Sequence, residues 1–133
     1  MALRIILAAV ALLLALNGLN MLFDPAGWYA SVPSVPHTGP LNPHFVRDIG
    51  IAYLTSSLSV GLAAWRGAYF WPGLITALAF LGLHALLHIW EAIIGLPASM
   101  HMSTVDLVGV YGPAVILLAI VGWVRLQPGT KET

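Results

Sequence analysis

The residues best suited to chemistry in this sequence form the pattern His84-x-x-x-His88-x-x-Glu91. Residues three or four apart lie on one face of a helix, so the two imidazoles and the carboxylate share a narrow stripe. Such ligands suit a borderline metal ion such as Zn²⁺, Fe²⁺, Mn²⁺ or Cu²⁺. The spacing therefore predicts a site for a transition metal or a redox cofactor.

Further polar residues fall at the matching ends of neighbouring apolar segments. His44 and Asp48 open one segment, and Asp106 opens another. We expect His44 or Asp48 to complete the coordination of a metal ion. Hydrogen bonds with Asp106, Asn17 and Asn20 would then orient the imidazoles. Ionisable groups inside a membrane are costly and mark functional sites, so these residues are expected to surround one polar pocket.

The segments that carry these residues are long enough to cross a membrane. Of 133 residues, 59% are hydrophobic and 8% are charged, a composition too apolar for a water-soluble domain. A membrane-spanning helix needs about 20 residues, and the ranges 3–23, 43–65, 70–94 and 104–124 meet that length. We therefore expect one all-α domain over residues 1–133, an antiparallel bundle of four transmembrane helices.

Positive residues beside these segments set the expected orientation. Arg4, Arg66, Arg125 and Lys131 flank one side, whereas only Arg47 falls on the other. Cytoplasmic loops retain lysine and arginine. Both termini are therefore expected in the cytoplasm, with the chain in a bacterial inner membrane. The expected partners are the lipid bilayer and either a larger membrane complex or further copies of the chain; nucleic acid is not expected.

The connection between the first two segments is rich in proline and is expected to form an exterior cap. Five prolines restrict its backbone: Pro25, Pro33, Pro36, Pro40 and Pro43. Asn42 can cap the second helix, and Pro43 suits its first turn because no N–H is needed there. Cysteine is absent from the chain, which excludes disulfides and thiolate metal ligands.

Two cofactor alternatives use the same residues. Axial ligation of haem needs imidazoles from two helices, so His44 would have to pair with His84 or His88. A quinone site needs only a hydrogen-bond donor and an apolar slot, which His88, Tyr53 and Trp90 could provide.

Two alternatives need no cofactor. In a membrane-embedded acid/base enzyme, Glu91 or His88 would transfer protons near Asp48 while Arg47 holds an anionic group of a lipid-soluble substrate. In an accessory or assembly subunit, the polar layer would only join helices, at about 0.6 kcal/mol for each interhelical hydrogen bond.

The chain resembles the small bacterial four-helix membrane proteins of the DoxX-like type in its size, its expected topology and its retained first helix. Several members of that group accompany respiratory or redox enzymes. The resemblance implies a redox-associated or accessory role, and it assigns no site residue.

Overall fold

The computed structural model describes residues 1–33, 35–65, 67–95 and 104–127, and every regular element in these ranges is a helix. The long helices are α1 (Ala2–Phe23), α3 (Pro43–Trp65), α4 (Phe70–Ile93) and α6 (Gly112–Leu126). The short elements are α2 (Pro25–Ser31), α5 (Thr104–Asp106), the 3-10 helices η1 (Val35–His37) and η2 (Gly67–Tyr69), and the π-helix η4 (Leu107–Tyr111). The expected all-α fold is confirmed.

Three helical stretches are long and apolar enough to cross a membrane. They are Ala2–Phe23, Gly67–Ile93 and Thr104–Leu126, with 22, 27 and 23 residues. At about 1.5 Å per residue, each can cover a hydrocarbon core of about 30 Å. The length and composition of these three helices are thus compatible with an integral membrane protein. α3 also has 23 residues, but its charged residues and serines make it less apolar than the other three stretches.

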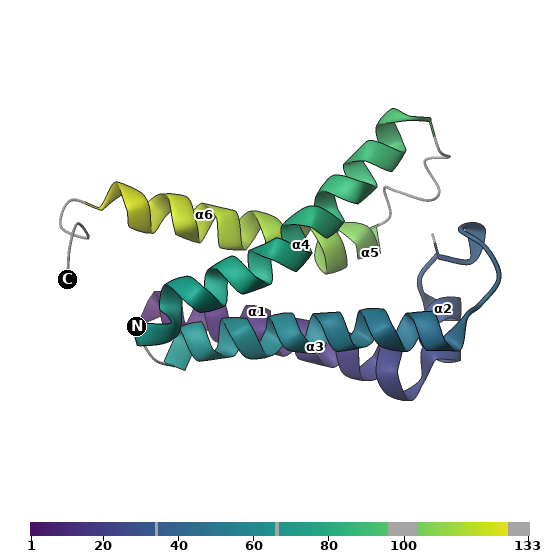
Figure 1. Ribbon diagram of the computed structural model, residues 1–133, viewed down its shortest axis with the longest axis horizontal. Helices are drawn as coiled ribbons and strands as arrows, with labels where there is room; N and C mark the ends of the chain where they lie inside the picture. Colours follow the sequence, from purple (N-terminus) through teal and green to yellow (C-terminus); the bar gives the residue numbers. More distant parts are fainter. Residues whose placement is uncertain (34, 66, 96–103, 128–133) are drawn as a thin grey trace.

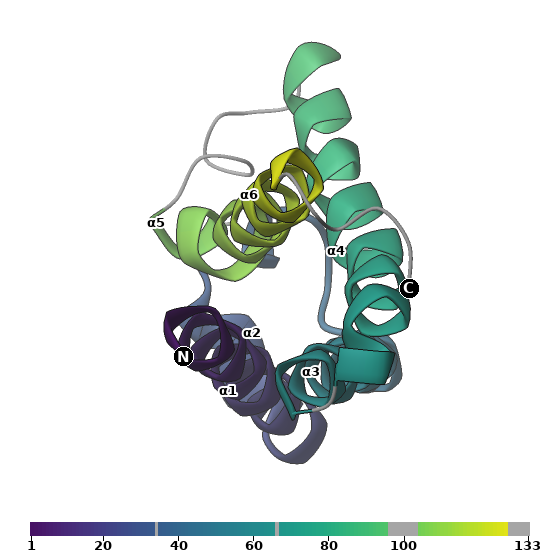
Figure 2. The same cartoon turned by 90° about the vertical axis from the view of Figure 1, so that its left-hand side faces the viewer.

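α1 and α3 lie antiparallel and side by side (Figure 1 and Figure 2). Their backbones touch at two glycines, because a Cβ atom added to Gly18 would come 2.7 Å from the carbonyl oxygen of Gly50. Further along, the hydroxyl of Ser57 donates a hydrogen bond of 2.7 Å to the carbonyl oxygen of Ala11. Small residues permit this direct packing of one helix backbone on the other.

α4 begins beside the end of α3 and then diverges from it, so that the far end of α4 stands apart from the α1–α3 pair (Figure 1). The two helices touch at the start of α4, where a Cβ atom on Gly73 would overlap the carbonyl oxygen of Ser59. α6 packs against α4. The shared core includes fully buried leucines from α1, α4 and α6: Leu7, Leu14, Leu74, Leu81 and Leu117.

The proline-rich connection contains α2 and η1 and folds back on α1. The carboxylate of Asp24 caps α2 by accepting a hydrogen bond of 2.9 Å from the N–H of Gly27, and Pro25 fills the first turn. The indole N–H of Trp28 donates to the side-chain oxygen of Asn17 at 3.0 Å. This bond ties α2 to the last turns of α1.

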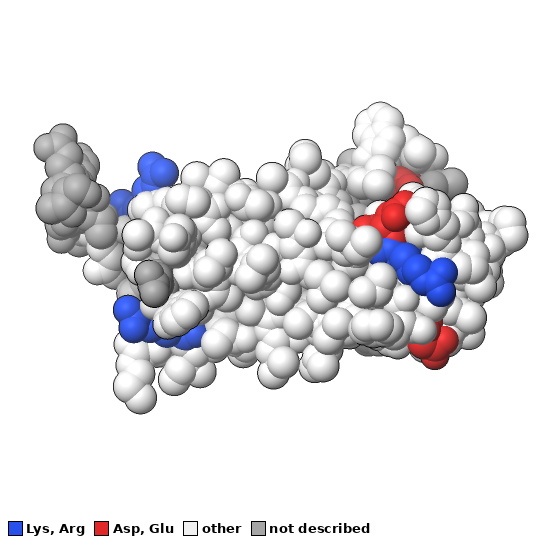
Figure 3. All heavy atoms as spheres, turned by 60° about the horizontal axis from the view of Figure 1, so that its bottom comes forward, with Lys and Arg blue, Asp and Glu red and all other residues white. Residues whose placement is uncertain are grey.

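Charged side chains gather at the two ends of the molecule (Figure 3). Arginines lie at the end where α1 begins and α6 finishes, and they include Arg4 and Arg125. The start of α3, the ends of α1 and α4, and α5 lie toward the other end (Figure 1), and they carry Arg47 and the four described acidic residues, which are Asp24, Asp48, Glu91 and Asp106. Arg66 and Lys131, which also entered the expected orientation, lie outside the described residues. The face between the two ends carries no charge in Figure 3.

Replacing Gly18 with alanine is expected to destabilise the protein, because the new methyl group would meet the carbonyl oxygen of Gly50 and, at 2.9 Å, the side chain of Leu54. Overpacking costs about 1–3 kcal/mol, which exceeds the gain of about 1 kcal/mol from alanine's helix propensity. Thermal unfolding in detergent should show a lower Tm.

Gly82→Ala is the matched control, since nothing lies within 4 Å of a Cβ atom at that helical position. Its Tm should equal or exceed that of the unmodified protein. If Gly18→Ala behaved in the same way, the α1–α3 contact would be looser than the structure has it.

Candidate functional site

His84 and His88 share one face of α4, as their spacing predicts. Their ring centroids are 4.8 Å apart and the ring planes meet at 76°. Both residues are half-buried, whereas the neighbouring Leu83 and Leu87 are exposed, at 68% and 51%. In a membrane, exposed leucines face lipid. The two imidazoles therefore lie at the border between the protein interior and the lipid-facing side of α4.

These imidazoles belong to a larger row of rings. Phe80 stacks on His84, with centroids 5.5 Å apart and planes at 10°. Tyr53 of α3 meets Phe80 at 5.3 Å and His84 at 6.1 Å, both in T-shaped geometry. Tyr111 of the π-helix lies 6.2 Å from His88. The ring row, which consists of Tyr53, Phe80, His84, His88 and Tyr111, thus follows α4 for two turns and joins it to α3 and to the π-helix η4.

The side chain of Tyr53 bonds to a backbone carbonyl that a proline in α6 leaves without its usual donor. Pro113 has no N–H to donate to the carbonyl of Gly109, four residues earlier. The hydroxyl of Tyr53 donates to that carbonyl at 3.1 Å. The same region is wound as a π-helix, in which the N–H of Gly112 bonds to Leu107, five residues back. Single π-turns inside helices are frequent at functional sites.

Asp106 is the buried acid of this site, with only 4% of its surface exposed. It interacts electrostatically with Tyr53, His84 and Tyr111. Glu91, on the same helix as the histidines, interacts with Tyr111 in the same way. A carboxylate in hydrocarbon is costly and usually has a functional partner. The predicted neighbourhood of His84, His88, Glu91 and Asp106 is therefore extended by two tyrosines.

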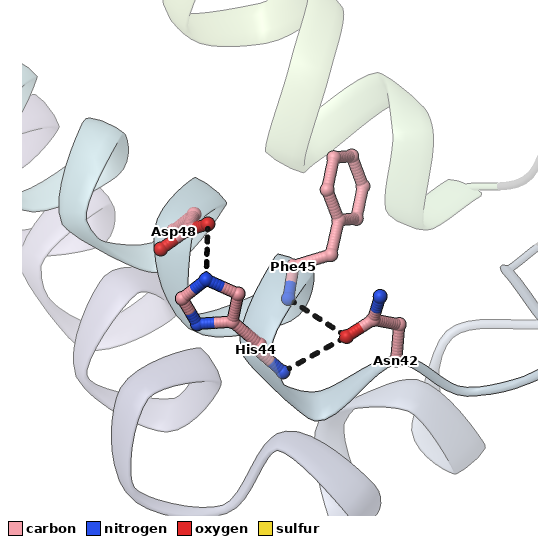
Figure 4. Close-up of polar contacts among 4 residues, drawn as sticks. All are labelled: Asn42, His44, Phe45 and Asp48. Atoms are coloured by element: carbon pink, nitrogen blue, oxygen red, sulfur yellow. Dashed lines mark hydrogen bonds and ion pairs between the residues drawn. The ribbon is translucent and has the colours of Figure 1, made fainter.

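His44 and Asp48 form a pair of their own on α3 (Figure 4). Their side chains approach to 3.5 Å, one helical turn apart, and are 86% and 53% exposed. The helix that holds them starts at Pro43, and the side chain of Asn42 caps it by accepting hydrogen bonds from the N–H groups of His44 and Phe45 at 3.1 and 3.2 Å. Their high exposure sets this pair apart from the half-buried histidines of α4.

The remaining predicted residues hold α1 to its neighbours or face outward. The Nε of Arg47 donates to the carbonyl oxygen of Leu22 at 3.2 Å, a favourable place for a cation because helix carbonyls point outward at this end. Asn17 accepts from Trp28. Asn20 and Trp90 are exposed.

In the part of the chain that the structure describes, no three His, Asp or Glu side chains form a group that could hold a metal ion. The predicted metal site remains a prediction. Sequence reasoning did not single out Phe80, which looks like any other apolar residue of α4, or the π-helix, whose one signal is the Gly112-Pro113 pair.

Comparisons of this chain with family models, with curated proteins and with solved structures find no match. The likeness to DoxX-like proteins in size and expected topology therefore stays a prediction.

Tyr53→Phe is expected to lower stability by about 0.5–1.5 kcal/mol, the usual contribution of one hydrogen bond. The ring contacts with Phe80 and His84 would remain, while the carbonyl of Gly109 would lose the hydroxyl that donates to it. Thermal unfolding in detergent measures the effect. The control is Tyr69→Phe at a residue that is 45% exposed, and equal Tm values for the two variants would contradict a role for the hydroxyl.

Proposed function

We propose that the chain is an integral membrane protein with four spans, of which α3 is the fourth. α3 lies beside α1 (Figure 1), so a membrane crossed by α1 is crossed by α3 as well. The arginines at the end where α1 begins and α6 finishes support a topology with both termini in the cytoplasm, under the positive-inside rule. α2 and η1 then cap the exterior surface of a bacterial inner membrane.

In this topology the ring row lies below the exterior surface, within the hydrocarbon. α4 ends at Ile93, so His88 lies about 8 Å and His84 about 14 Å from that end along the helix. Polar groups at such a depth must bond to protein or to a ligand, because water is scarce there. A ligand for these groups would reach them through the bilayer.

The ligand we infer is a lipid-soluble molecule of the quinone class. Its head group is a flat ring with carbonyl acceptors. Such a group would pack against the stacked pair formed by Phe80 and His84, and His88 and Tyr111 would supply N–H and O–H donors beside that pair. The observation that carries this proposal is the combination of stacked rings and donors at the lipid-facing border of α4.

Asp106 and Glu91 give the site a means of handling protons. Both acids interact electrostatically with Tyr111, and carboxylates next to a bound ligand can act as general acids or bases. Electrons for quinone chemistry would come from a partner enzyme in a larger membrane complex. The proposed function is thus a quinone-binding accessory subunit, which fits the redox-associated role that the DoxX-like resemblance implies.

Binding of decylubiquinone to detergent-purified protein tests this function. The chain has five tryptophans, so quenching of their fluorescence reports the titration. His88→Phe and Tyr111→Phe keep a flat ring but remove the N–H or O–H donor. We expect each to raise Kd by about tenfold, since one such hydrogen bond contributes about 1.5 kcal/mol.

His44→Phe is the matched control, because this histidine is 86% exposed and paired with Asp48. Its Kd should not change. The same Kd in all four proteins would refute the site. A wild-type protein that binds no decylubiquinone, combined with a lower Tm in His88→Phe, would favour the interpretation in which the ring row only joins helices.

A transition-metal site is the second candidate, favoured by the 4.8 Å separation of the two imidazole rings. Nitrogens at about 2.0–2.1 Å from a zinc ion could bind it from adjacent turns. Tag-free protein would then contain near-stoichiometric metal by elemental mass spectrometry, and His88→Ala would lose it. Metal-free samples after incubation with Zn²⁺ would exclude this candidate.

A further inference from the structure

An open groove separates the start of α1 from the end of α3, at the opposite end of the molecule from the ring row. Its volume is about 920 Å³, within the range of about 300–1,000 Å³ common for small-molecule sites. The groove is open above Gly61, because a Cβ atom added to this glycine would meet only the Cβ atom of Ala11, at 4.0 Å. Residues along the groove include Arg4, Ala8, Ala11, Gly61, Ala64 and Trp65.

Positive charge stands at the cytoplasmic mouth of this groove. Arg4 lines both the groove and a second hollow of about 310 Å³, which Trp71 and Val124 also border. The guanidinium of Arg125 lies 4.6 Å from the ring centroid of Trp71. All four described acidic residues belong to elements that lie toward the other end (Figure 1). The arginines are thus well placed to meet a negative charge from outside the described chain.

We propose that the groove holds an acyl chain of an anionic phospholipid whose phosphate contacts Arg4. From Arg4 to Ala11 the groove follows α1 for about 10 Å into the hydrocarbon, the direction an acyl chain takes below its head group. Guanidinium groups match phosphate geometry, and each arginine near an anionic membrane surface strengthens binding. This site is independent of the ligand of the ring row.

Charge distinguishes the lipid from another helix. A stripe of small residues also suits a helix of a second copy. A second copy inserted in the same orientation would bring its own Arg4 and Arg125 to this level, which opposes close approach. An anionic lipid brings the opposite charge to the same place, so the lipid is the favoured occupant.

Native mass spectrometry of the detergent-purified chain tests the proposal with phosphatidylglycerol and phosphatidylcholine of identical acyl chains. Phosphatidylglycerol should bind more tightly, and Arg4→Gln should weaken its binding by about fivefold, as expected for one arginine near anionic lipid. Ala8→Leu, which fills the groove, should weaken binding of phosphatidylglycerol several-fold. Ala9→Leu is the matched control, since Ala9 is also exposed on α1 but does not line the groove.

Four results would overturn the proposal. The first is equal binding of the two lipids, and the second is an equal effect of Ala8→Leu and Ala9→Leu on lipid binding. The third is competition by inorganic phosphate that weakens lipid binding as much as Arg4→Gln does, combined with no effect of Ala8→Leu. The fourth is a dimer that Ala8→Leu dissociates. Arg4 and Ala8 are both exposed, so both variants should keep the Tm of the unmodified protein, and this is measured alongside.

Discussion

The direct contact between the backbones of α1 and α3 is the constraint on which the rest of the structure depends. Gly18 and Gly50 bring the two helices within reach of each other's carbonyl groups, and the bond from Ser57 to Ala11 fixes their register. α3 in turn supports α4 through the contact of Gly73 with Ser59. The position of Tyr53, and with it the ring row, follows from this sequence of contacts.

Much of the fold could be predicted from the sequence because hydrophobic length leaves few choices in a chain this apolar. The bounds of α1, α3 and α4 fall within a turn of the expected ranges, whereas the range 104–124, expected as one helix, is divided into α5, η4 and α6. The cap formed by Asn42 is where the Asn-Pro pair indicated. The divergence of α4 from α3 could not be predicted, since no periodic pattern in one sequence sets the angle between two helices.

The candidate site was predicted in part. Helical spacing brought His84 and His88 together, because that relation lies within one helix. Spacing also relates His44 to Asp48, four residues on, and in the structure they pair with each other on an exposed face. Contacts between helices, such as those of Tyr53 with Phe80 and with Gly109, need a three-dimensional arrangement that one sequence does not supply.

The bond from Tyr53 to Gly109 also bears on the order in which the chain enters a membrane. The carbonyl of Gly109 lacks a donor at Pro113, and an unsatisfied backbone group in hydrocarbon costs several kcal/mol. During synthesis α3 emerges before α6, so the hydroxyl that satisfies this carbonyl is already in place when the last segment arrives. A rearranged gene that encoded the last helix first would therefore insert Gly109 before the hydroxyl of Tyr53 is available to its carbonyl.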